Sequence, residues 1–365
     1  MIYEVSYKLH KVVERRGIIM NYQLLLRELC SENAPSGLEF KLHPIMEKNF
    51  GYIKDLEISK DENYNLYINK KGKRNGTIMI MAHSDEISLV ITEVIEGGFL
   101  RFKAIGMDAN ILLGQEVAIH GCEVINGVIG GIPKSKTDDN ILKKAVVTSD
   151  LFIDTGYPKE YLEEVIKIGD RATLIGEYKN LLRNTISSKA IDDRAGILSM
   201  LICAQELKEH ELDVVFVCSC QEELGHRGAK MASYKVKPNL AIAIDVTFDN
   251  GEFGDRDREN KLGNGPIICI GPNNHPRMIK KLKEVARKYY IPFGVEVEPG
   301  NTGSDAWDIQ VSRGGIPTVL VSIPIKYMHT SVETANLGDI KNTGRLVARF
   351  IEEIKLLDLE ELTCF

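Results

Sequence analysis

A long apolar run that ends in two acidic residues constrains the fold of this chain most. The run extends over residues 214–220 (VVFVCSC) and shows no alternation of polar and apolar residues. Such a run is typical of a strand buried on both faces, as in the parallel centre of an α/β sheet. Gln221, Glu222 and Glu223 follow it directly. Because reactive groups in α/β sheets lie beyond the carboxyl ends of the strands, we expect this acidic pair at a functional edge, the alternative being a solvated loop.

Composition and length favour a globular protein of two domains. The chain has 365 residues, 44% of them hydrophobic and 27% charged, and a net charge of -6 without a block of lysine and arginine. Neither nucleic acid nor a membrane is therefore an expected partner. Seven cysteines without a CxxC pair indicate reduced thiols, with Cys218 and Cys220 as apolar core residues. No apolar stretch reaches about 18 residues and no signal-peptide core is evident, so we expect a cytoplasmic protein.

The order of the patterns along the chain predicts an insertion. Buried runs at 77–82, 240–244 and 318–323 and amphipathic helices near 22–29 and 276–290 belong to an α/β domain. Between them, residues 87–181 contain short alternating segments separated by glycine pairs, as in a small β-rich domain.

We therefore predict a mixed, largely parallel sheet flanked by helices, formed by residues 20–86 and 182–360. A β-rich domain of residues 87–181 is inserted into it. Residues 1–19 precede a cleaner helical pattern that starts at Met20, and they are interpreted as a possible N-terminal extension.

Acidic and imidazole side chains follow several of the predicted buried elements. They are His83, Asp85, Asp192, Asp193, Glu222, Glu223, Asp245 and His329. Two imidazoles with several carboxylates form a suitable ligand set for a pair of borderline divalent cations. Each residue also has an ordinary explanation: an acidic pair that caps a helix, an aspartate in a turn, or a surface histidine. Their joint occurrence at the mouth of one sheet favours the metal site.

The same residues lie in motifs that resemble a known family. The motifs are His83-Ser84-Asp85-Glu86, Ile191-Asp192-Asp193-Arg194-Ala195-Gly196, Gln221-Glu222-Glu223-Leu224-Gly225 with Arg227-Gly228-Ala229, Ile244-Asp245-Val246, and Tyr327-Met328-His329-Thr330-Ser331-Val332-Glu333. In this order, over residues 20–353, the chain resembles the two-metal aminopeptidases of metallopeptidase family forty-two. That family includes tetrahedral, glutamyl and deblocking aminopeptidases, and some members are labelled endoglucanase. The resemblance implies a zinc-exopeptidase-like fold.

The resemblance also implies the role of each site residue. Asp192 would bridge two divalent ions per subunit, most simply Zn²⁺ or Co²⁺. His83 and Asp245 would complete one ion, and Glu223 and His329 the other. Glu222 would be the general base for a bridging hydroxide. Asp85 would be a catalytic orienting residue whose carboxylate accepts the His83 ring N–H.

The implied activity is removal of N-terminal residues from short peptides. The resemblance further implies self-association through the inserted domain, often into particles of twelve chains. The sequence departs from the family pattern at Ser88, His226 and Thr330, which replace a glycine, an apolar residue and a serine. These departures leave the ligands intact but affect the shape of the pocket and the preferred substrate.

Three other functions remain open at this point. An amidohydrolase or deacylase acting on acylated amino acids would use the same metal chemistry. An endoglucanase would place two carboxyl groups across the scissile bond and would leave His83 and His329 unexplained. A catalytically silent binding protein is opposed by the complete ligand set and by Glu222.

Overall fold

The computed structural model describes residues 20–131, 145–250 and 260–363, and the expected extension at 1–19 lies outside them. Its main feature is an 11-stranded mixed sheet with the path β1-β2-β12-β3-β13-β16-β17-β11-β10. The four central strands are parallel: β12 (Asp213–Ser219), β3 (Thr77–His83), β13 (Leu240–Phe248) and β16 (Thr318–Lys326). Their carboxyl ends therefore meet at one edge.

The outer pairings of this sheet are mostly antiparallel. On one side lie β2 (Leu66–Lys70) and β1 (Leu56–Lys60), and on the other β17 (Glu333–Asn336), β11 (Thr185–Ser188) and β10 (Lys179–Asn180). The strand β14 (Ile267–Ile270) pairs antiparallel with β16 and parallel with β15 (Gly294–Val297).

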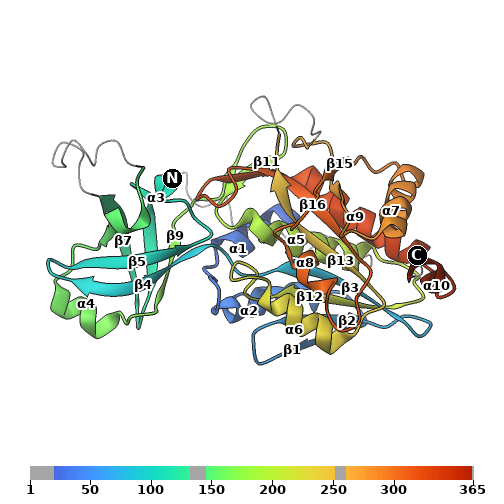
Figure 1. Ribbon diagram of the computed structural model, residues 1–365, viewed down its shortest axis with the longest axis horizontal. Coiled ribbons are helices and arrows are strands. Elements are labelled where there is room, and N and C mark those ends of the chain that lie inside the picture. The colour runs from blue at the N-terminus through green and yellow to red at the C-terminus, as the bar shows by residue number, and fades with distance from the viewer. Residues whose placement is uncertain (1–19, 132–144, 251–259, 364–365) are drawn as a thin grey trace, which may run out of the picture.

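Side chains of the central strands alternate between two cores, so helices cover both faces of the sheet (Figure 1). Ile78 and Ile80 of β3 join the larger core, whereas Met79 and Met81 join the smaller one. Four helices contribute most to the larger core: α1 (Tyr22–Ser31), α5 (Ile191–Glu206), α7 (Pro276–Lys288) and α9 (Leu337–Glu353), with α2 (His43–Phe50), which follows η1 (Glu39–Lys41), and α10 (Asp358–Thr363) beside them. The smaller core lies under α6 (Arg227–Val236) and α8 (Asp305–Ile309).

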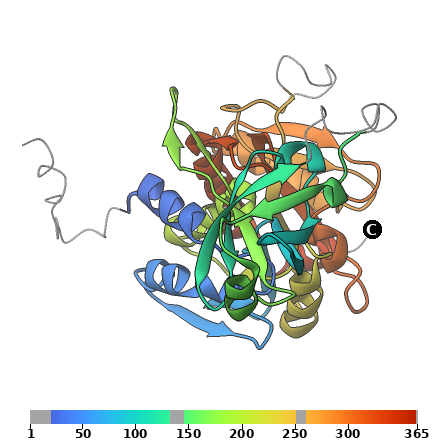
Figure 2. The same cartoon turned by 90° about the vertical axis from the view of Figure 1, so that its left-hand side faces the viewer.

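A closed barrel with its own apolar core stands beside the large sheet (Figures 1 and 2). Its strands follow the order β4-β5-β8-β7-β6-β9. They are β4 (Ser88–Ile95), β5 (Phe99–Ile105), β6 (Glu116–His120), β7 (Val124–Gly131), β8 (Leu151–Asp154) and β9 (Arg171–Leu174), with the short helices α3 (Ala109–Leu112), η3 (Thr148–Asp150) and α4 (Lys159–Val165). The mixed α/β sheet and the separate small β-domain confirm the predicted fold class.

Two strands are longer than the sequence-based expectation. β13 continues past Asp245, and β16 continues through Pro324. Proline is tolerated there because, on one side of β16, the β14 pairing ends at Ser322 and the β17 pairing begins at Ile325.

No helix within residues 20–131, 145–250 and 260–363 combines the length and the apolar character that crossing a bilayer requires.

Candidate metal centre

The five side chains predicted as ligands come together at the carboxyl edge of the parallel strands. His83 is the last residue of β3, and Asp245 lies within β13. Asp192 belongs to the first turn of α5, while Glu223 and His329 lie in the segments after β12 and β16. All five are drawn from different elements of the α/β domain, so the sheet itself determines their spacing.

Asp192 stands between the two imidazoles. Its Oδ1 lies 2.9 Å from His83 Nε2, and its Oδ2 lies 3.3 Å from His329 Nε2. Glu223 Oε1 is 3.5 Å from the same nitrogen of His329. Two groups of three residues with ligand atoms within 4.8 Å of one another share Asp192: one adds His83 and Asp245, and the other adds Glu223 and His329.

The pKa values at this site are shifted because several buried carboxylates lie close to one another. Burial and neighbouring carboxylates raise the pKa of Glu223 and Asp245 well above the usual range. Burial alone would raise the pKa of Asp192, but hydrogen bonds with His329 and His83 hold it below its ordinary value. For His329, burial favours the neutral ring, yet the contacts with Asp192 and Glu223 raise its pKa to about 9.

This donor set fits divalent cations. Carboxylates packed at such distances repel one another, and positive charge between them removes that penalty. Imidazole nitrogen and carboxylate oxygen are the ligands that borderline ions such as Zn²⁺ and Co²⁺ accept. The chemistry of the residues thus agrees with the metal dependence that the sequence predicts.

A cavity of about 450 Å³ opens onto the cluster. Besides the five residues, its walls include Glu222, His226, Phe248, Glu296, Thr302 and Met328. Glu222 is 8% exposed and lies in the loop between β12 and α6. A carboxylate that lines the cavity next to the ligand cluster can exchange a proton with a group bound there.

The position of Asp85 differs in part from the expectation. The nearest partner of His83 Nδ1 is the backbone carbonyl of Asp85 at 3.1 Å, and the carboxylate Oδ1 is 3.5 Å away. The carboxylate instead accepts hydrogen bonds from the backbone N–H groups of Glu222 at 3.0 Å and Glu223 at 3.3 Å, and from Ser36 Oγ at 2.6 Å. Asp85 therefore holds the acidic loop as well as standing next to the imidazole.

Two buried glutamates that support the cluster were not assigned a role from the sequence. Glu333 accepts hydrogen bonds from the backbone N–H groups of Asp192 at 3.0 Å and His329 at 2.7 Å. Glu39 accepts one from the backbone N–H of Gln221 at 3.0 Å. Glu333 was visible only as the last residue of the motif that contains His329. Its function depends on a contact across 141 positions, which local patterns cannot reveal.

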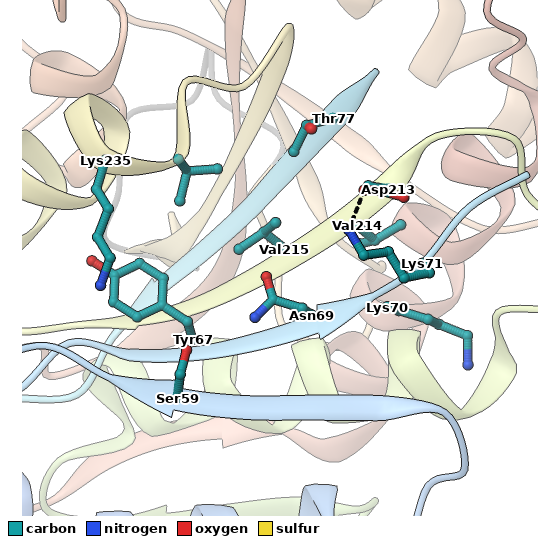
Figure 3. Close-up of a pocket in the computed structure, with 11 residues that line it drawn as sticks. Ser59, Tyr67, Asn69, Lys70, Lys71, Thr77, Asp213, Val214, Val215 and Lys235 are labelled. Atoms are coloured by element: carbon teal, nitrogen blue, oxygen red, sulfur yellow. Dashed lines mark hydrogen bonds and ion pairs between the residues drawn. The ribbon is translucent and has the colours of Figure 1, made fainter. Parts of the chain in front are cut away.

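A second cavity, of about 320 Å³, lies over β1, β2, β12 and β3 away from this cluster (Figure 3). Two of the lysines that line it have partners in the structure. Lys71 Nζ is 2.9 Å from Asp213 Oδ2, and Lys235 Nζ lies 4.2 Å from the centre of the Tyr67 ring. Both contacts stabilise this edge of the sheet and need no bound ligand to explain them.

Comparisons with known proteins show the family of this chain. The family model described as M42 glutamyl aminopeptidase matches residues 64–346. A lysyl aminopeptidase of Pyrococcus furiosus is 34% identical over 84% of this chain and 90% of its own.

Solved structures give the same result. An aminopeptidase from the archaeon Desulfurococcus kamchatkensis superposes with a TM-score of 0.87 at 33% identity, covering 94% of this chain and 98% of its own. A TET peptidase of Pyrococcus horikoshii, which can assemble into a tetrahedron or a large octahedral shell, has a TM-score of 0.79 at 29% identity and covers 92% of this chain and all of its own. The chain therefore belongs to the M42 aminopeptidase family and is a hydrolase of peptide bonds.

Proposed function

We propose that this aminopeptidase removes N-terminal residues from short peptides and that it uses a dinuclear metal centre. His83, Asp192 and Asp245 would hold one ion, and Glu223 and His329 would hold the other together with Asp192 as the shared ligand. The observation that carries this assignment is the position of Asp192, which directs one carboxylate oxygen to each imidazole and belongs to both groups of three.

Two bound cations would supply Lewis-acid chemistry: they polarise the scissile carbonyl, make water acidic enough to react near neutral pH, and offset negative charge on oxygen. The remaining work belongs to the side chains. Glu222 takes the proton of the attacking water on its carboxylate and returns it to the leaving amine. Asp85 fixes the backbone of this residue, so the base meets the substrate in a defined position.

The physical setting supports peptide substrates of limited size. The cavity of about 450 Å³ beside the cluster has the size of a pocket for a small ligand. We infer self-association through the barrel as well, a dodecamer being the arrangement that the family resemblance suggests. Six cysteines of the described chain are free thiols, and five of these are buried, which favours a reducing, cytoplasmic setting.

Metal removal and reconstitution test the proposal. The protein is treated with a chelator, dialysed, and assayed on aminoacyl anilides and on peptides with free or acetylated N-termini. We expect loss of cleavage, recovery with two equivalents of Zn²⁺ or Co²⁺ per chain, and cleavage of free N-termini only. Full activity after metal removal would contradict the metal mechanism, and preference for acetylated substrates would favour a deacylase.

Sedimentation tests the assembly separately. A protein that remains monomeric at micromolar concentration would contradict self-association through the barrel and leave the catalytic proposal intact.

A further inference from the structure

His226 lies between two carboxylates at the wall of the catalytic cavity. It precedes α6 with a left-handed backbone, φ being 55°, and its side chain is 13% exposed. Its Nε2 is 3.1 Å from Glu222 Oε1, and its Nδ1 is 2.8 Å from Asp308 Oδ2. One imidazole thus joins the acidic loop after β12 to the helix α8.

Both ring nitrogens of His226 face acceptors, so both must carry a proton to make the two contacts. Burial by itself favours the neutral ring, but the hydrogen bonds with Glu222 and Asp308 and the charges of Glu222 and Asp305 outweigh it and raise the pKa of His226 to about 9. Asp308 is held in turn, because Lys230 Nζ lies 3.4 Å from the same oxygen. The anchor on the far side of the imidazole is therefore fixed.

Glu222 is constrained from two directions. Asp85 Oδ1 accepts the hydrogen bond of its backbone N–H, and His226 contacts its Oε1. Within residues 20–131, 145–250 and 260–363 no group donates a hydrogen bond to the second carboxylate oxygen, Oε2, and the Glu222 side chain borders the cavity that the cluster shares. This division suits a general base, because one oxygen is anchored and the other can accept the proton of the reacting water.

We propose that His226 is a positioning residue for Glu222: it donates Nε2–H to Oε1, and Asp308 orients the ring by accepting Nδ1–H. The role rests on the proposed function of Glu222 as the base. His226 is absent from the groups of residues that could hold a metal ion, so it acts through the carboxylate and not as a ligand.

Substitution of His226 separates this role from a structural one. His226→Asn suits the left-handed backbone, which asparagine adopts readily, but its shorter side chain cannot span both acids. His226→Gln keeps an N–H donor within reach of Glu222. We expect kcat of the asparagine variant to fall about 10- to 100-fold with KM changed less than about twofold, and the glutamine variant to recover most of the loss.

Two measurements accompany the kinetics. The metal content should remain that of the wild type in both variants. Crystal structures of the metal-free proteins should show a displaced Glu222 side chain in His226→Asn and its original position in His226→Gln. Lys235→Gln, farther along α6 and away from the catalytic cavity, serves as the control and should keep kcat.

The outcomes distinguish this inference from the proposed function. Unchanged kcat in His226→Asn, a rise in KM alone, or an unmoved Glu222 would overturn the positioning role while metal-dependent cleavage by the wild type still stands. Equal losses in both variants with a lower melting temperature would assign His226 to helix capping and also overturn it. A wild-type protein without metal-dependent cleavage would overturn the proposed function, and the inference with it.

Discussion

Glu222 and Glu223 are neighbours in sequence but meet different partners. Glu223 faces His329 in the ligand cluster, whereas the carboxylate of Glu222 contacts His226. Consecutive side chains near a strand end point in different directions, so one acidic pair can serve both the metal and the substrate. The distinct surroundings lead to distinct consequences when either charge is removed.

We predict that Glu222→Gln loses turnover and keeps its metal. The amide retains the shape of the side chain but cannot accept a proton, so kcat should fall by about 10²- to 10⁴-fold. Kinetics on an aminoacyl anilide, together with metal analysis, measure both effects. Glu223→Gln is the matched control. It should bind less metal than the wild type, because it removes a proposed ligand. Wild-type kcat in Glu222→Gln would assign the proton transfer to another group.

His120 in the barrel provides a prediction for stability against pH. It is 8% exposed, and its Nε2 lies 2.9 Å from Thr173 Oγ1. Burial, assisted by the charge of Lys41, lowers its pKa from 6.5 to about 4. Since the unfolded chain takes up this proton first, the stabilisation is complete above pH 6.5 and is lost as the pH falls towards 4, by at most about 3 kcal/mol.

Urea unfolding of the metal-free protein at pH 7 and pH 4.5 tests this. The wild type should lose more free energy of unfolding than His120→Asn, which cannot titrate. An equal loss of unfolding free energy in both proteins would show that the fold does not lower the pKa of His120.

Residue types and their order pointed to eight candidate side chains near predicted buried elements, and the family resemblance selected five of them as ligands. The supporting contacts were not accessible in the same way. The backbone is left-handed at Gln221 and His329, with φ of 52° and 62°, and it turns the chain abruptly beside the cluster. Glutamine and histidine do not by themselves predict this conformation. The pairing of His226 with Asp308 crosses 82 positions and has no local signature.

At the scale of elements, β17 has a role beyond extending the sheet. Its first residue, Glu333, is 1% exposed and receives backbone hydrogen bonds from Asp192 and His329. The strand thereby connects the helix that carries the bridging candidate to the loop that carries the second imidazole. Contacts of this kind, behind the ligands, commonly determine metal affinity.

We predict that Glu333→Gln weakens metal binding about 10- to 100-fold, because the amide can accept only one of the two backbone hydrogen bonds. Competition with a chromophoric chelator measures the affinity. Val332→Ala, at an exposed neighbouring position, should bind metal as the wild type does. Wild-type affinity in Glu333→Gln would limit this residue to folding.

Element predictions succeeded where burial was continuous and failed where pairing changes partner. The central strands were identified because they are apolar on both faces, as for Ile78 and Met79 of β3. The length of β16 was underestimated at Pro324, since the change from β14 to β17 that accommodates the proline depends on strands far away in sequence. Pairing order in general is a tertiary property and was left open.

At the scale of the whole molecule, the barrel domain contacts the segments that carry Glu223 and His329. Gln115 Oε1 accepts a hydrogen bond from Ser331 Oγ at 2.8 Å, two residues after His329. At Gly106, with φ of 72°, an added Cβ would lie 2.9 Å from Glu223 Oε2. The barrel therefore supports the ligand loop in addition to the assembly proposed for it.

We predict that Gln115→Ala lowers metal affinity by up to about tenfold, since the loop that carries His329 loses its contact with the barrel. Ser331→Ala should have the same effect, and the double variant should be no worse than either single one. Additive losses in chelator competition would show that the two side chains act independently.

The candidate ligands are scattered along most of the chain, from the end of β3 to the segment after β16. A fragment of this chain that ends before residue 329 lacks at least one of the candidate ligands. On the proposed mechanism, a growing polypeptide therefore gains peptidase activity only after synthesis has passed His329. The spacing of the candidate ligands along the chain thus delays proteolysis until most of the protein has been made, without a separate inhibitor.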